Sequence, residues 1–255
     1  MSGLLDSISF FTIFPAGNNR KLDRGMIKFF TVAGLIAAIL PALAFYGLSL
    51  HIGSVASSAV SLSLLLLISG FNHLDGVLDS GDAIMSHSDT ARRREILKDR
   101  YTGAGGIGTA IVIYLTYFAV LSSFKPLDGF FAILVSEMSS KLIMVMSLGR
   151  YPTFGDGLAT LFKSFYRDSR MSPWILNAIP AVLISLLYGI SGVLSLVAAL
   201  IFGTILASWI SGLFDGLNGD TIALSGESAR VFCLLFLALA LSLLPHTGIF
   251  GLRLL

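Results

Sequence analysis

Three aspartates spaced for one face of a helix form the most distinctive polar feature of this sequence. Asp75, Asp79 and Asp82 are four and three residues apart, which places their carboxylates on the same side of a helix. Like charges this close repel one another unless a cation lies between them, and oxygen ligands of this kind suit Mg²⁺. A solvated acidic helix face is the alternative, but the adjoining apolar segments disfavour it. The sequence therefore predicts that these aspartates bind Mg²⁺.

A second acidic patch lies much later in the chain, in the segment Asp215–Glu227. Asp220 and Glu227 are seven residues apart, which again places both on one face of a helix. Asn218 and the glycine after it indicate a turn just before Asp220, and an ordinary surface turn is the alternative. We predict that Asp220 is a further metal ligand or the group that accepts a proton. Asn218 and Glu227 are predicted to contact substrate.

Basic and glycine residues follow the first aspartates. Arg93, Arg94 and Lys98 could bind phosphate oxygens, which arginine does with two parallel hydrogen bonds. Setting the membrane topology or contacting anionic lipid is the alternative for these bases. Gly103 and Gly106 begin an apolar segment, and N–H groups at a helix N-terminus favour anions, although glycine also serves close helix packing. We predict that these five residues bind substrate.

Four other side chains stand out within or beside apolar segments. His73 lies two residues before Asp75, where a structural role is more common than a catalytic one. Glu137 and Lys141 are four residues apart, so they can form an ion pair on one helix. We expect this pair to be structural or to line a pocket, because charges inside a membrane are usually paired or functional. Cys233 is the only cysteine and is expected to pack in an apolar span.

The elements that must position these residues are apolar helices. The chain is 55% hydrophobic and 13% charged, with a mean hydropathy of +0.85. Four long stretches contain no Asp, Glu, Lys or Arg, and each can hold one or two membrane spans of about 20 residues. We predict an all-α, polytopic membrane helix bundle of about seven transmembrane helices, in a single integral membrane domain over residues 1–255. Residues 1–27 are expected at the membrane interface, and the spans at 29–50, 53–71, 104–124, 129–148, 173–191, 194–213 and 230–250.

The basic residues predict the orientation of the bundle. Seven spans place 14 of the 17 Lys and Arg residues on one side, which the positive-inside rule assigns to the cytoplasm. The candidate site loops then lie in the cytoplasm, with the C-terminus outside, in a multi-pass protein of the inner cell membrane. We expect small-molecule substrates and membrane lipid as partners, and no nucleic acid. An oligomer is possible, because the sequence does not determine the number of subunits. The bases are Arg20, Lys21, Arg24, Lys28, Arg92, Arg93, Arg94, Lys98, Arg100, Arg150, Lys163, Arg167, Arg170 and Arg230.

These motifs, in this order, resemble the signature of the cobalamin synthase family, the adenosylcobinamide-GDP ribazoletransferases. The resemblance extends over nearly the whole chain, and its first acidic motif is the most specific part. The matching segments are His73-Leu74-Asp75-Gly76 with Asp79 and Asp82; Arg93-Arg94-Glu95 with Lys98-Asp99; Gly103-Ala104 with Gly106; Gly216 to Ile222 with Glu227; and Ser9 to Pro15.

The sequence departs from the family pattern at three places. Asn218 stands where the family usually has threonine, and Ala223-Leu224 stands where it has Gly-Ala. In the middle loop, Phe154 replaces an arginine. This last change removes one candidate for binding phosphate.

The resemblance implies a Mg²⁺-dependent enzyme that joins adenosylcobinamide-GDP to α-ribazole or its 5′-phosphate and releases GMP. In such a reaction a ribose hydroxyl attacks a phosphorus atom of a pyrophosphate, which requires in-line positioning and charge neutralisation. Asp82, Asp220 and His73 are then the candidate catalytic groups. Which of them accepts the hydroxyl proton, and which bind metal, stays open at this point.

Two other classes of membrane protein carry comparable acidic residues. A CDP-alcohol phosphotransferase performs similar chemistry, but its aspartates follow a different spacing, in which Asp-Gly does not come first. An ion-coupled secondary transporter holds its acids near the midplane of paired repeats. Here the acids lie at span ends and no internal repeat is visible.

Overall fold

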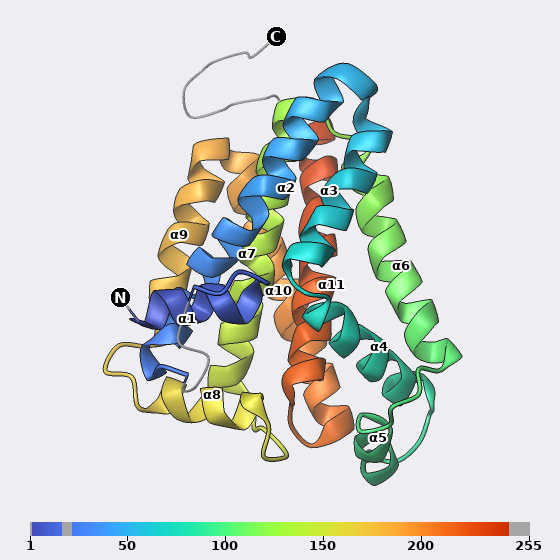
Figure 1. Ribbon diagram of the computed structural model, residues 1–255, viewed down its shortest axis with the longest axis vertical. Helices are drawn as coiled ribbons and strands as arrows, with labels where there is room; N and C mark the ends of the chain where they lie inside the picture. The colour runs from blue at the N-terminus through green and yellow to red at the C-terminus, as the bar shows by residue number, and fades with distance from the viewer. Residues whose placement is uncertain (1, 17–21, 245–255) are drawn as a thin grey trace.

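The structure is a computed structural model that describes residues 2–16 and 22–244, and this part of the chain is a bundle of α-helices (Figure 1). It contains no β-strand, only an isolated bridge between Thr153 and Leu217, so the all-α prediction is confirmed. The expected external C-terminus lies outside the described residues. The elements are α1 (Ser2–Phe11), the 3-10 helix η1 (Arg24–Phe29), α2 (Phe30–Ile52), α3 (Ser54–Ile68), α4 (Asn72–Met85), α5 (Thr90–Ile96), α6 (Ala104–Leu121), α7 (Pro126–Arg150), α8 (Leu158–Arg167), α9 (Pro173–Tyr188), α10 (Ile190–Phe214) and α11 (Gly219–Leu243).

Within residues 2–16 and 22–244, five helical segments are long and apolar enough to cross a membrane, which confirms the polytopic class. The sequence predicted about seven spans, whereas these residues give five, or six if α3 and α4 form one broken span. The reason is length: α3 has 15 residues and α9 has 16, whereas a straight span takes about 20. The five segments are Arg24–Ile52, Ala104–Leu121, Pro126–Arg150, Ile190–Phe214 and Gly219–Leu243.

The chain turns sharply between α3 and α4, at an angle of 91°. Gly70 and Phe71 have φ values of +61° and +59°, and these left-handed conformations break the helix. The Ile13 N–H donates to the Ile68 carbonyl at 2.8 Å, so the N-terminal segment binds the end of α3. Because α4 has 14 residues and carries Asp75, Asp79 and Asp82, we treat it as lying outside the membrane-spanning segments.

The last span begins much earlier than the sequence predicts. The last span was expected at 230–250, but α11 starts at Gly219. Asn218 and Thr221 form a capping box that closes the N-terminus of this helix. Charged residues at 220, 227 and 230 lowered the apparent hydropathy of a segment that is nevertheless helical. Asp220 and Glu227 therefore lie two turns apart on one helix.

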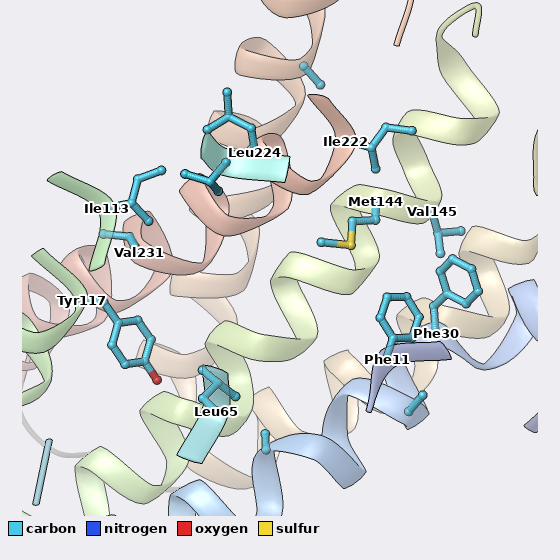
Figure 2. Packing of buried hydrophobic residues seen from close by; sticks show 14 of the residues in the cluster. Phe11, Phe30, Leu65, Ile113, Tyr117, Met144, Val145, Ile222, Leu224 and Val231 are labelled. Atoms are coloured by element: carbon cyan, nitrogen blue, oxygen red, sulfur yellow. The ribbon is translucent and has the colours of Figure 1, made fainter. Parts of the chain in front are cut away.

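Helix α7 runs through the middle of the bundle between α2 and α11 (Figure 1). Small residues allow the close approach: a Cβ added to Gly34 of α2 would lie 2.7 Å from Lys141 Cγ, and one added to Gly226 of α11 would lie 2.5 Å from Met144 Cε. Figure 2 shows the aromatic end of this core, where the rings of Phe11 and Phe30 meet edge to face at 4.7 Å. The core thus fixes α11 against α7.

The short helices α5 and α8 lie at one end of the bundle (Figure 1). The N-terminus of α11 and the C-terminus of α10 lie at this same end. The polar segments α5, α8 and the turn between α10 and α11 are therefore gathered at one end of the bundle.

Candidate functional site

Asp75, Asp79 and Asp220 lie near one another where α4 packs against α11. Gly76 makes this packing close: a Cβ added there would lie 2.9 Å from Ala223 Cβ and 3.0 Å from Asp220 Cα. Any larger residue would push the two helices apart. Asp75 is exposed, and Asp79 and Asp220 are partly buried. Acids from two distant parts of the sequence thus share one region, as the sequence analysis predicts.

The acidic cluster of Asp75, Asp79 and Asp220 is electrostatically unfavourable by itself. Burial, followed by repulsion from Asp75, Asp220 and Asp82, raises the pKa of Asp79 to about 6. A bound cation would favour the charged carboxylate and reverse this shift. Donors that are all carboxylate oxygens suit a hard ion such as Mg²⁺ or Mn²⁺.

The acidic cluster is not a closed metal site. Across the residues that the structure describes, no three Asp, Glu, His or Cys side chains converge closely enough to hold an ion by themselves. The predicted set of four aspartates is therefore not assembled as one ligand group, although Mg²⁺ binding itself stays a prediction. Mg²⁺ often takes one or two protein carboxylates and completes its shell with water and substrate phosphates. The arrangement fits this open kind of site.

Asp82 caps the N-terminus of α6. Its Oδ2 accepts a hydrogen bond from Gly103 N–H at 2.5 Å, and its Oδ1 accepts one from Gly106 N–H at 2.8 Å. The carboxylate satisfies two free N–H groups and lies at the positive end of the helix dipole. In the structure Asp82 accepts both of these N–H groups, and substrate binding by Gly103 and Gly106 stays a prediction. The predicted catalytic and metal roles of Asp82 stay predictions.

Asn218 orients Asp220. Its Oδ1 accepts a hydrogen bond from Thr221 N–H at 3.0 Å, and its Nδ2 donates to Asp220 Oδ2 at 2.7 Å. The same side chain thus caps α11 and holds the carboxylate beside it. Asn218 was predicted to contact substrate, but in the structure it contacts Asp220.

Arg93 and Arg94 bind the C-terminal end of α10. Arg94 donates to the Phe214 carbonyl from Nε at 2.9 Å and from Nη2 at 2.6 Å, and to the Asp215 carbonyl at 3.1 Å. Arg93 donates to the Leu213 carbonyl at 3.4 Å. Both charges therefore lie at the negative end of a helix dipole. The predicted binding of substrate phosphate by this pair stays a prediction.

Phe154 completes the contact around Arg94. The guanidinium carbon lies 4.5 Å from the centre of the Phe154 ring, which stacks on Phe214 at 6.2 Å. The Phe154 N–H also donates to the Leu217 carbonyl at 3.1 Å. The phenylalanine that replaces the family's arginine therefore has a packing role. Of the three bases predicted to bind phosphate, Lys98 alone is exposed.

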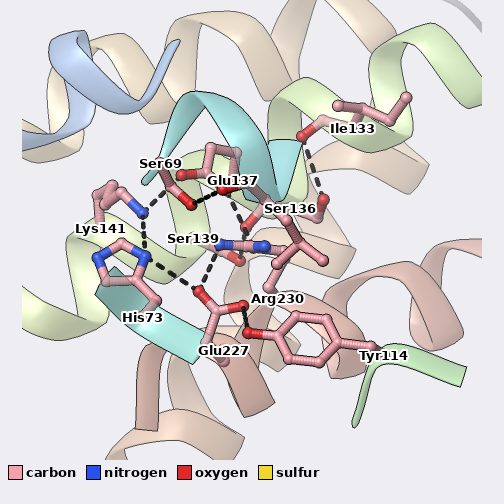
Figure 3. A network of polar contacts seen from close by, with 11 residues as sticks. Ser69, His73, Tyr114, Ile133, Ser136, Glu137, Ser139, Lys141, Glu227 and Arg230 are labelled. Atoms are coloured by element: carbon pink, nitrogen blue, oxygen red, sulfur yellow. Dashed lines mark hydrogen bonds and ion pairs between the residues drawn. The ribbon is translucent and has the colours of Figure 1, made fainter. Parts of the chain in front are cut away.

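Five polar side chains from three helices form a buried charge network: His73, Glu137, Lys141, Glu227 and Arg230 (Figure 3). Lys141 Nζ lies 2.6 Å from Glu137 Oε1, which confirms the predicted ion pair. Arg230 contacts Glu137 through Nε at 2.9 Å and Glu227 through Nη2 at 2.5 Å. His73 Nδ1 lies 3.2 Å from Glu227 Oε1. The predicted pair is thus one part of a larger assembly.

The network contains two of the predicted site residues and adds a third. Glu227 is 1% exposed and contacts Arg230 and His73, and its predicted contact with substrate stays a prediction. Within the network His73 faces Glu227 and Lys141, and its predicted catalytic role stays untested. Arg230 was counted only as a basic loop residue. Its three-residue spacing from Glu227 was the available signal, because it allows an ion pair on one helix.

The chain is similar to proteins of one known family. Residues 3–238 match the family model described as cobalamin-5-phosphate synthase. The chain is 35% identical to an adenosylcobinamide-GDP ribazoletransferase of Picrophilus torridus, over 96% of this chain and all of that protein. It is 32% identical to a protein of the same description from Thermoplasma acidophilum, over 95% and 94% of the two chains. No solved structure matches this chain.

Proposed function

This chain belongs to the cobalamin-5-phosphate synthase family, and on that basis we propose that it joins adenosylcobinamide-GDP to α-ribazole or its 5′-phosphate. The single observation that supports this most is the acidic cluster, in which carboxylates from α4 and α11 lie beside one another. The cluster lies on the part of the sequence that carries the family's most specific motif. A membrane transferase of this kind releases GMP and leaves a phosphodiester in its product.

The proposed reaction needs a nucleophile, a leaving group and a proton acceptor. A ribose hydroxyl of the acceptor attacks the phosphorus atom next to the cobinamide part of the donor. A new P–O ester bond forms, the bond to the bridging oxygen breaks, and GMP leaves. The hydroxyl proton passes to a carboxylate of the protein. In-line positioning and stabilisation of charge on oxygen supply most of the catalysis in such reactions.

We assign different tasks to the carboxylates of the acidic cluster. Asp75 and Asp79 would hold Mg²⁺ together with substrate phosphates, and the ion would neutralise charge on the reacting oxygens. Asp220 would accept the hydroxyl proton, because Asn218 fixes one of its oxygens at 2.7 Å and so holds the carboxylate in place. Lys98 is exposed and could attract the anionic donor.

The test is turnover by the purified protein in detergent. With adenosylcobinamide-GDP, α-ribazole and Mg²⁺, the wild-type protein should release GMP and form the joined product. Asp220→Asn should lower kcat by about 10²–10⁴-fold, the usual effect of losing a general base, while the Mg²⁺ dependence stays unchanged. Partial rescue by excess Mg²⁺ would instead make Asp220 a metal ligand.

Asp215→Asn is the matched control for Asp220→Asn. Asp215 is an exposed acid in the same turn, and its φ of +49° is one that asparagine tolerates well. It should keep normal activity. A wild-type protein that releases no GMP under these conditions would refute the proposed activity, and equal losses in both variants would refute the role of Asp220.

We also propose that the end of the bundle that carries α5 and α8 faces the cytoplasm, because most of the basic residues belong to its loops. Thiol labelling in sealed vesicles tests this, since the native Cys233 is buried. Ser88→Cys, between α4 and α5, should be labelled from the cytoplasmic side. Ser123→Cys, between α6 and α7, should be labelled from outside. The reverse pattern would overturn the orientation.

A further inference from the structure

The buried charge network places four formal charges inside the bundle. Glu137, Lys141, Glu227 and Arg230 are each 1–2% exposed. A charge at the centre of a membrane span costs about 2.5–3.5 kcal/mol on the insertion scale, so such residues are usually paired and functional. Two acids and two bases balance here, but hydrophobic residues of similar size would often be at least as stable. Stability alone therefore does not explain this set of residues.

Arg230 connects α11 to α7. Its guanidinium reaches two carboxylates, Glu137 on α7 at 2.9 Å and Glu227 on α11 at 2.5 Å. Lys141 contacts the other oxygen of Glu137, at 2.6 Å. Nη2 donates a hydrogen bond to Glu227, whereas Nε lies in ion-pair contact with Glu137 without hydrogen-bond geometry. A guanidinium is long and planar enough to reach both carboxylates at once, and it therefore links α11 to α7.

His73 connects α4 to the same network. Its Nδ1 lies 3.2 Å from Glu227 Oε1 and 3.4 Å from Lys141 Nζ, and its ring lies 5.7 Å from that of Phe11. His73 is the second residue of α4, two positions before Asp75. The N-terminus of α4 is thus held directly by residues of α7 and α11.

We propose that the buried charge network positions the two halves of the acidic cluster, with His73, Arg230 and Glu137 acting as positioning residues for the transfer reaction. Glu227 lies two turns from Asp220 on α11, and His73 lies one half-turn from Asp75 on α4. Any shift of α4 against α11 changes the separation of Asp75 and Asp79 from Asp220. This inference rests on the proposed function, because the separation matters only if those carboxylates act together.

His73 provides the sharpest test, because its side chain can be replaced in two ways. His73→Asn keeps a hydrogen-bonding group near the place of Nδ1, whereas His73→Leu removes it at similar volume. We expect His73→Leu to lower kcat by about tenfold to a hundredfold, since misplacement by about 1 Å can have this effect. The KM for the GDP-linked donor should stay near that of the wild type. His73→Asn should keep most of the activity.

A second readout does not depend on turnover. Mn²⁺ binding to the detergent-solubilised protein, followed by electron paramagnetic resonance, reports whether the acidic cluster is still assembled. His73→Leu and Arg230→Lys should weaken Mn²⁺ binding several-fold, while His73→Asn should not. Asn177→Ala is the matched control: Asn177 is also a fully buried polar residue, but it joins α9 to α2 and η1. It should lower the melting temperature without changing kcat or Mn²⁺ affinity.

The outcomes separate the two proposals. If His73→Asn is as inactive as His73→Leu while Mn²⁺ binding is unchanged, His73 acts chemically and the positioning role is overturned. Normal kcat and normal Mn²⁺ affinity in both His73→Leu and Arg230→Lys would overturn it as well. If the wild-type protein releases no GMP but the variants change Mn²⁺ binding as expected, the proposed activity fails, and the network positions the acidic cluster for cation binding only.

Discussion

Removing the Asp82 carboxylate should loosen the start of α6. Asp82→Ala deletes two hydrogen bonds, to Gly103 N–H at 2.5 Å and to Gly106 N–H at 2.8 Å. A hydrogen bond to a charged group contributes about 1.5–3 kcal/mol, and loss of a helix N-cap costs about 0.5–2 kcal/mol. Both values describe the same contact and are therefore not added. For a partly exposed side chain we expect the free energy of unfolding to fall by about 2 kcal/mol. Asp82→Asn keeps one acceptor and should lose about half as much.

Thermal unfolding in detergent, without divalent metal, measures this loss directly. For a chain of this size about 1 kcal/mol corresponds to about 2–4 °C, so Asp82→Ala should melt about 4–8 °C below the wild type. Asp99→Ala is the control, because Asp99 is an exposed acid whose carboxylate accepts only one backbone hydrogen bond, at 3.2 Å. If Asp82→Ala melts like the wild type without metal but is no longer stabilised by Mg²⁺, the carboxylate binds metal and the capping explanation is wrong.

Three further predictions test the acidic cluster and the end of α10. Without metal, the melting temperature should fall as pH rises from 3.8 to about 6, because the raised pKa of Asp79 makes its charged form unfavourable in the folded state. Adding Mg²⁺ or introducing Asp79→Asn should flatten this pH profile. A flat profile in the metal-free wild type would contradict the prediction. Gly76→Leu should lower GMP release at least about tenfold by separating α4 from α11, whereas Gly47→Leu should not, since no atom lies within 4 Å of the Cβ added there. Arg94→Lys should lower the free energy of unfolding by about 1–2 kcal/mol in thermal melts, because it loses the forked contact to two carbonyls. Arg92 lies in an exposed ion pair, so Arg92→Lys should change the free energy of unfolding by less than about 1 kcal/mol. Equal losses in the two variants would argue against a stabilising contact of Arg94 with the end of α10.

Features that depend on spacing along one helix could be predicted from the sequence. The spacing of Asp75, Asp79 and Asp82 predicted a helix, and α4 contains all three. The four-residue spacing of Glu137 and Lys141 predicted their ion pair, which the structure forms. Long uncharged stretches predicted the membrane class, because apolar length is a property of the sequence itself.

Features that depend on contacts between helices could not be predicted in the same way. The hydrogen bonds between Asp82 and N–H groups of α6 join residues 21 and 24 positions apart, and the predicted metal role of Asp82 stays a prediction. The contact of Arg94 with the end of α10 joins residues 120 positions apart. The start of α11 was placed too late because Glu227 and Arg230 seemed too polar for a span. Their charges neutralise each other on α11, and Arg230 also contacts Glu137 of α7, which no local pattern reveals.

The buried charge network also bears on how the protein enters the bilayer during synthesis. Each of the two helices that supply its charges carries an acid and a base that contact each other, Glu137 with Lys141 on α7 and Glu227 with Arg230 on α11. Because each of these pairs lies within one helix, its opposite charges can neutralise one another before that helix meets its neighbours. The contact from Arg230 to Glu137 forms only when the helices associate. Insertion thus depends on the ion pairs within each helix, and assembly depends on the contact between the helices. A substitution among these four residues can therefore disrupt one step and leave the other intact.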